Sequence, residues 1–166
     1  MSTPIKNGVS YYHPKDGCIY LIGGWDEKET LDTIFKYDPR TQETHFVAHL
    51  PHKIEGHSLC AIDSTLFIFG GFDSFGVTDT IIAVDTTNWE SQVLKDIKMK
   101  YKRENLTSQV INGDTIVVAG GWGSGKSMDY IEVFKVEGKE LRAIPEEEHG
   151  LSLSCIRNRP CSVSII

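Results

Sequence analysis

Hydrophobic positions recur along the chain as short apolar runs that each end in two glycines. The runs read CIYLIGG, LFIFGG and TIVVAGG, and they end at Gly23-Gly24, Gly70-Gly71 and Gly120-Gly121. The doublets are 47 and 50 residues apart. A period of this length is typical of repeat architectures, in which one supersecondary unit is copied along the chain. The pattern therefore predicts three copies of one unit.

Each copy is expected to contain four short strands. A strand-like run ends fourteen residues after each second glycine, at Asp38, Asp85 and Lys135. A pair of turn-forming residues lies eight residues before each second glycine. The glycine-ended runs are almost wholly apolar, which predicts strands buried on both faces, whereas the fourth runs are mixed, as an exposed edge requires. The units span approximately residues 8–50, 57–97 and 105–145, all within 1–150.

The glycine doublets, the turn YDPRTQE at residues 37–43 and the segment LPHKIEGHSLCAI at residues 50–62 resemble the kelch-repeat family. The resemblance implies an all-β fold of kelch-type β-propeller blades, in which the six doublet glycines are structural. The family usually has a tryptophan in the fourth strand, where this chain has Thr44, Ser91 and Leu141. Trp89 lies two positions from Ser91, so we expect it to substitute after a small shift.

A propeller closes as a ring of roughly four to eight blades, so three four-stranded blades are incomplete or are completed by oligomerisation. The segment GLSLSCI resembles the first strand of a fourth blade, and residues 151–166 are expected to hold that extra strand and a tail. Two assemblies stay open. The favoured one is part of a larger propeller, and the other is a homodimer that completes a six-bladed ring.

Charge and composition limit the classes of partner that the chain is expected to bind. The net charge is −6 and the basic residues are scattered, which argues against a nucleic-acid surface. No apolar run is long enough to span a membrane and the amino terminus has no signal-peptide pattern, so we expect a cytoplasmic protein with no membrane contact. Four cysteines without zinc-site spacing, Cys18, Cys60, Cys155 and Cys161, are expected to be free thiols.

Two sequence features suggest that the chain could bind a nucleotide or a metal ion. The run GGWGSGKS at Gly120 to Ser127 matches the phosphate-binding pattern GxxxxGK[ST], but that loop requires a following helix, and MDYIEVFKV favours a strand. His49, His52 and His57 invite a metal-dependent propeller enzyme, although their spacing does not favour a ligand set. We therefore expect a non-enzymatic chain with no cofactor and no metal, and keep nucleotide binding and metal catalysis as alternatives.

The leading hypothesis is a protein–protein interaction module, an adaptor or scaffold that binds another protein through inter-strand loops. The loops after the doublets read WDEKET, FDSFGVT and WGSGKS, so an aromatic residue follows each Gly-Gly. Equivalence across the repeats favours packing roles for these first aromatics, whereas exposed aromatics are typical interface anchors. The candidate partner-binding residues are Trp25, Asp26, Glu27, Phe72, Phe75, Trp122 and Lys126.

Overall fold

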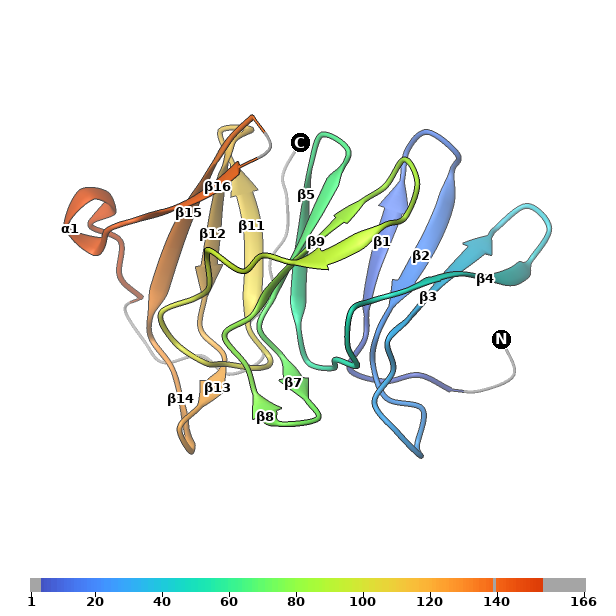
Figure 1. Cartoon of the computed structure of the whole chain (residues 1–166), viewed down its shortest axis with the longest axis horizontal. Coiled ribbons are helices and arrows are strands. Elements are labelled where there is room, and N and C mark those ends of the chain that lie inside the picture. The colour runs from blue at the N-terminus through green and yellow to red at the C-terminus, as the bar shows by residue number, and fades with distance from the viewer. Residues whose placement is uncertain (1–3, 139, 154–166) are drawn as a thin grey trace.

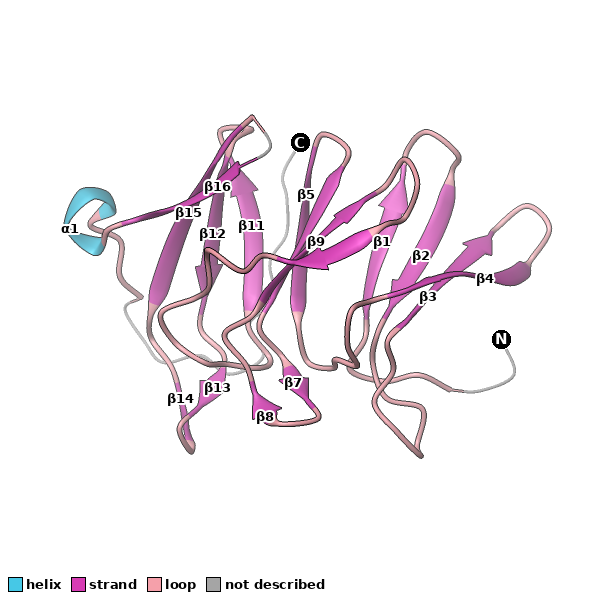
Figure 2. Cartoon of the chain, in the orientation of Figure 1, coloured by secondary structure: helices cyan, strands magenta, loops and turns pink. Residues whose placement is uncertain are grey.

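The computed structural model describes residues 4–138 and 140–153, and it consists mainly of antiparallel sheet (Figures 1 and 2). Three four-stranded sheets, here called blades 1 to 3, lie side by side with blade 2 between the other two (Figure 1). This confirms the predicted fold class of propeller blades. The predicted extra strand begins at residues without strand structure, 150–153, and its remainder lies outside the described residues.

Strands follow each other in chain order within every blade. Blade 1 contains β1 (Val9–His13), β2 (Cys18–Ile22), β3 (Thr33–Asp38) and β4 (Glu43–His49). Blade 2 contains β5 (Ser58–Ile62), β6 (Thr65–Phe69), β9 (Ile81–Asp85) and β10 (Ser91–Val93). Blade 3 contains β11 (Thr107–Ile111), β12 (Thr115–Ala119), β15 (Ile131–Glu137) and β16 (Glu140–Ile144).

Smaller elements join these strands. Two hairpins, β7 (Phe72–Asp73) with β8 (Gly76–Val77) and β13 (Trp122–Gly123) with β14 (Lys126–Ser127), connect the second and third strands of blades 2 and 3. One turn of helix, α1 (Glu146–His149), follows blade 3 and ends at Gly150. No helix within the described residues has the length and apolar character needed to cross a membrane.

The hydrophobic core lies between neighbouring blades because the second strands use both faces. In β2, Cys18, Tyr20 and Ile22 are buried and pack with Leu66 and Ile68 of β6. The alternate residues of β6, such as Phe67 and Phe69, pack instead with β12 and β15 of blade 3. A strand with period-two side chains can be apolar throughout only when another layer covers each face. Within the described residues, blade 2 therefore packs against a neighbouring blade on both faces, whereas blades 1 and 3 each pack against blade 2 on one face.

Candidate functional site

The loops between the second and third strands of all three blades project from the same end of the molecule, at the bottom of Figure 1. We call this surface the loop end and define it as residues 25–30, 72–78 and 122–127. Each loop is a hairpin or a close equivalent, because Trp25 bridges to Thr30, β7 pairs with β8 and β13 pairs with β14. The loop end contains all seven residues that the sequence suggested for partner binding.

Backbone pairing sets the position of the aromatic residue that follows each doublet. Trp25, Phe72 and Trp122 form bridges with Lys6, Glu55 and Glu104, each in the segment that leads into the first strand of the same blade. Both hydrogen bonds of every bridge are made, with lengths between 2.7 and 3.0 Å. Phe72 and Trp122 remain 41% and 36% exposed, so these aromatics are not buried in a blade interface as the packing alternative requires.

The doublet glycines are needed where the connector to the next blade crosses the strand end. The amide of Gly24 donates a hydrogen bond to the carbonyl of Ile54, and the amide of Gly71 donates to that of Arg103, each at 2.9 Å. A Cβ atom on Gly23 would lie 2.6 Å from the Ile54 carbonyl oxygen, and one on Gly70 would collide with that of Arg103. Gly70 also has a φ of 56°, which disfavours other residues.

Inter-blade backbone bonds hold the inner side of this end together. The amide of Gly56 donates to the carbonyl of Asn7 at 2.8 Å, and the amide of Asn105 donates to the carbonyl of Gly56 at 2.6 Å. These three residues occupy equivalent repeat positions and share a left-handed backbone. The first strands also meet at Ser58 and Ser108, whose hydroxyl oxygens are 2.8 Å apart. The blades therefore hold the three loops in a defined relation.

In the first loop, most of the predicted residues make local contacts. The carboxylate of Asp26 accepts hydrogen bonds from the amides of Lys28 and Glu29, which lower the pKa of Asp26. The ammonium group of Lys6 lies over the Trp25 ring, 4.2 Å from its centroid. Glu27 is exposed at the turn with a φ of 77°. Asp26 thus shapes the loop, and Glu27 is the outward-facing charge.

The second loop presents the most exposed aromatic residue. Phe75 is 99% exposed at the tip between β7 and β8. Its amide donates a 2.7 Å hydrogen bond to the carboxylate of Asp73, so a side chain of the loop itself stabilises the turn. Beside it lies a shallow, mainly apolar hollow of about 270 Å³ whose lining includes His52, Thr80 and Val93. The protein thus presents an apolar ring on an ordered turn.

The third loop does not have the structure of a phosphate-binding loop. Ser124 and Gly125 form the turn of the β13–β14 hairpin, and both have positive φ. The Trp122 amide, which would face a phosphate, donates to the Glu104 carbonyl at 2.7 Å. The chain continues into the strand β15 where the phosphate-binding motif requires a helix. Lys126 is therefore an exposed hairpin charge.

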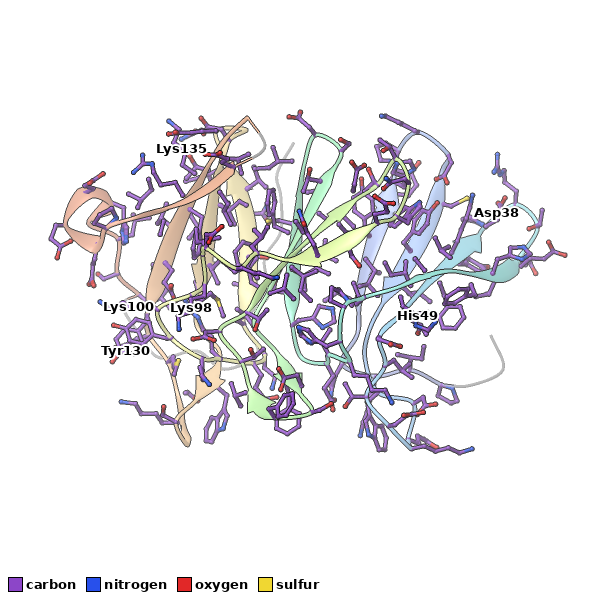
Figure 3. All side chains as sticks on the ribbon, viewed as in Figure 1. Asp38, His49, Lys98, Lys100, Tyr130 and Lys135 are labelled. Carbon is purple, nitrogen blue, oxygen red and sulfur yellow. The ribbon has the colours of Figure 1, made fainter. Side chains whose placement is uncertain are left out.

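The three histidines His49, His52 and His57 lie in different surroundings, the first at the end of β4 and the other two in the connector to blade 2. His49 forms a 3.0 Å contact with Asp32 at the outer edge of blade 1, where Figure 3 labels it. His52 contacts the Lys53 carbonyl at 3.2 Å, whereas His57 is buried at the junction of blades 1 and 2. Within residues 4–138 and 140–153, no three His, Cys, Asp or Glu side chains are grouped closely enough to hold a metal ion.

Comparison with known proteins agrees with these blades. A family model for the Kelch motif matches residues 15–48. Kelch-like protein 40 of Xenopus tropicalis is 30% identical over 145 residues, which cover 83% of this chain and 23% of that protein. Kelch-like protein 21 of Rattus norvegicus is 30% identical over 104 residues, covering 61% and 17%. The chain belongs to the kelch-repeat family.

A solved structure supports the same fold at lower sequence similarity. The structure of YjhT aligns with a TM-score of 0.70 and 16% identity, and the match covers 85% of this chain and 51% of that one. This kelch-repeat chain therefore spans about half the length of YjhT and about a quarter of Kelch-like protein 40.

The fourth strand of blade 2 has Ser91 where the kelch family usually has a tryptophan, and Trp89 takes over its packing role. Trp89, just before β10, stacks on Tyr20 of blade 1 with 3.9 Å between ring centroids. The Tyr20 hydroxyl donates to Asp16 at 2.8 Å, and Lys36 and His13 each contact the same carboxylate at 3.0 Å. Burial alone would raise the pKa of Asp16, but these hydrogen bonds outweigh it and hold the pKa well below its usual range. Trp89 thus joins blades 1 and 2.

Sequence reasoning missed the importance of Arg103, which lies in the connector from blade 2 to blade 3. Its side chain is fully buried, donates to the carbonyls of Gly120 and Tyr130 at 3.1 and 2.9 Å, and pairs with Glu132 at 2.5 Å. Tyr130 also stacks on Tyr101 of the same connector, beside Lys98 and Lys100 (Figure 3). A basic residue within KYKRE looks solvated in the sequence, so no local signal identified it.

Proposed function

We propose that this kelch-repeat chain is a non-enzymatic protein-binding module of the adaptor or scaffold type and that the loop end is its binding surface. The single observation that carries the proposal is Phe75, a 99% exposed aromatic side chain at the tip of an ordered hairpin. Exposed aromatic rings supply large apolar contact area at little conformational cost, and such residues dominate protein interfaces. The half-exposed Phe72 and Trp122 extend the same apolar surface.

Charges around these rings differ between the loops, which favours a partner bound in one orientation. The first loop contributes the exposed carboxylate of Glu27 next to the exposed ammonium group of Lys28, and its Glu29 pairs with Lys53. The third loop contributes the exposed ammonium group of Lys126. Such asymmetry selects for complementary charge and steers association more than it adds affinity. A cytoplasmic location and a protein partner fit this proposal. A second copy of the chain is another candidate partner.

The matching kelch-like proteins support a role in protein interaction, because their resemblance to this chain lies in its repeats. The alternatives of nucleotide and metal chemistry have weaker support. The hairpin at residues 122–127 uses the Trp122 amide for strand pairing, and the connector histidines face different partners. Binding by a loop surface needs neither of these chemistries.

Replacement of Phe75 by serine tests the proposal. The full chain, the Phe75→Ser variant and the Leu151→Ser variant are each used as bait in a cell extract, and captured proteins are quantified by mass spectrometry. Leu151 is a matched control because it is an exposed apolar residue, 42% accessible, outside the loop end. We expect Phe75→Ser to reduce the recovery of specific partners about tenfold or more, as loss of an interface anchor does. Equal recovery by all three baits would refute the loop end as the binding surface.

A further inference from the structure

The aromatic residue that follows each glycine doublet lies opposite a charged residue in the segment that leads into the first strand of its blade. The three pairs are Trp25 with Lys6, Phe72 with Glu55 and Trp122 with Glu104. Residues directly opposite each other in an antiparallel pair place their side chains on the same face, with Cβ atoms about 4.5–5.5 Å apart. Each ring therefore has a charged neighbour, but the charge is positive in the first pair and negative in the other two.

The first pair shows that a cation can cover a ring at this position. The ammonium group of Lys6 lies 4.2 Å from the centroid of the Trp25 ring. A positive charge over an aromatic face is attracted by the electron density of the ring. Trp25 is only partly exposed in this arrangement. Blade 1 thus covers its own ring with an internal cation.

The second pair has an open ring and the opposite charge. Glu55 occupies in blade 2 the repeat position that Lys6 occupies in blade 1, and Phe72 is 41% exposed. Within residues 4–138 and 140–153, lysines lie over the rings of Trp25 and Tyr101, and neither of these contacts involves Phe72. The ring of Phe72 therefore lacks the cation that its counterpart in blade 1 has.

Neutral donors hold the carboxylate of Glu55. One oxygen accepts a hydrogen bond from the side-chain amide of Asn7 at 2.8 Å, and the other accepts one from the hydroxyl of Thr30 at 3.1 Å. Both donors are uncharged, so the carboxylate keeps its negative charge, and each oxygen can accept a second hydrogen bond. Lys53, two residues earlier, pairs with Glu29 instead. The position thus combines an open aromatic ring with an oriented carboxylate.

This combination suits a guanidinium group. Arginine is planar, stacks on aromatic rings and donates two parallel hydrogen bonds to a carboxylate. The net charge of −6 also favours the approach of a basic partner. We infer that Phe72 and Glu55, at the edge of the loop end, bind an arginine side chain of the partner in the place that Lys6 takes on Trp25. This inference rests on the proposed function of the loop end.

Nuclear magnetic resonance of the full chain with a small probe tests the arginine site by itself. The probe is the tripeptide glycine-arginine-glycine, capped at both ends, and its control has citrulline in place of arginine, which keeps the shape and removes the charge. We expect the arginine probe to shift the amide signals of Glu55 and Phe72. The citrulline probe is expected to bind about fivefold more weakly or less, because it lacks both the cation–π attraction and the ion pair.

Removal of the carboxylate charge provides a second comparison. Glu55→Gln keeps the size of the side chain, and we expect it to weaken binding of the arginine probe about fivefold or more. Glu148→Gln is the matched control, since Glu148 is an exposed carboxylate in α1, outside the loop end, and it is expected to bind as the wild type does. Dispersed spectra show that each variant is folded, and the citrulline comparison needs no variant.

The outcomes separate this site from the proposed function. Unshifted signals of Glu55 and Phe72, equal affinity for the two probes, or equal affinity of Glu55→Gln and the wild type would each overturn the arginine site. None of these results would affect the loop end, which the capture experiment with Phe75→Ser tests without a probe. Equal recovery of partners in that experiment would refute the loop end and, with it, the role of the arginine site in partner binding.

Discussion

His57 shows how a residue that looks like a metal ligand becomes part of the core. It is 4% exposed where blades 1 and 2 meet, and neither ring nitrogen makes a full hydrogen bond within the described part of the chain. Burial lowers the pKa of His57 to about 4, and the nearby Ile22 carbonyl opposes this shift only in part. The ring is therefore neutral at physiological pH. A protonated imidazolium at this site would be an uncompensated buried charge.

This burial predicts acid sensitivity. The unfolded chain binds the proton with a pKa of about 6.5 and the folded chain with one of about 4, so the contribution of His57 is complete above pH 6.5 and falls as the pH drops toward 4. The loss reaches about 3 kcal/mol at most. Urea unfolding measured from pH 7 to pH 4 with the wild type and with His57→Phe checks this. The variant is expected to lose less stability over this range, and identical pH profiles would contradict the assignment.

At Gly70 the close approach of the next connector predicts a strong local requirement for glycine. Gly70→Ala is expected to destabilise the fold by about 2 kcal/mol or more, because a Cβ atom adds a collision with the Arg103 carbonyl to the cost of a positive φ. Gly113→Ala is the matched control, since Gly113 has a φ of 79° and a Cβ atom added there would meet no other atom within 4 Å. Thermal unfolding of both variants measures the difference. Equal losses would show that close approach is unimportant at Gly70.

The connectors between blades make stabilising contacts that the sequence did not predict. Arg103 in the second connector satisfies two carbonyls and Glu132 of blade 3, while its backbone carbonyl accepts from Gly71 of blade 2. One residue thereby joins both blades. Ion pairs that exclude water differ from surface pairs, because loss of one partner leaves a buried charge uncompensated.

The buried pair predicts different costs for the same substitution at two sites. Arg103→Met is expected to lower the free energy of unfolding by about 3–5 kcal/mol, because two carbonyls lose a donor and the Glu132 carboxylate loses its charge partner. Glu132 keeps only its hydrogen bonds from the amides of Lys100 and Tyr101. Arg40→Met is the matched control, since Arg40 pairs with Asp38 at the surface and is 72% exposed, so its replacement is expected to cost much less stability. Chemical denaturation of both variants provides the comparison. A small effect at Arg103 would contradict its role as a link between blades.

Elements with a strong local pattern were predictable, and those that depend on distant partners were not. The apolar runs before Gly23, Gly70 and Gly120 predicted the second strands because burial on both faces leaves a continuous signal. The two-residue strands β7, β8, β13 and β14 are too short for periodicity, so their segments were predicted only as loops. The second unit was expected over approximately residues 57–97, and its last strand, β10, ends at Val93.

Candidate site residues were predictable only as a set of loop positions. Phe75 was a candidate because it is an aromatic residue in an inter-strand loop, but its exposure depends on the turn held by Asp73. The sequence did not show that Asp26 caps its own loop or that Lys6 covers Trp25, since these contacts arise on folding. Arg103 is 29 positions from Glu132, so their pairing had no local signal.

At the scale of the whole molecule, the three blades of the described residues bury their core side chains where neighbouring blades meet. The loop end projects from one end of this row of blades (Figure 1). The structure thus places the aromatic residues of the three loops on one surface, which is the surface that we propose for partner binding.

Capture of partner proteins by the full chain and by the Phe75→Ser variant tests this account most directly, because the substitution removes only the exposed ring at the tip of the β7–β8 hairpin. The account predicts that Phe75→Ser recovers specific partners about tenfold less than the wild type, whereas Leu151→Ser recovers them equally. Equal recovery by the wild type and by Phe75→Ser would contradict it.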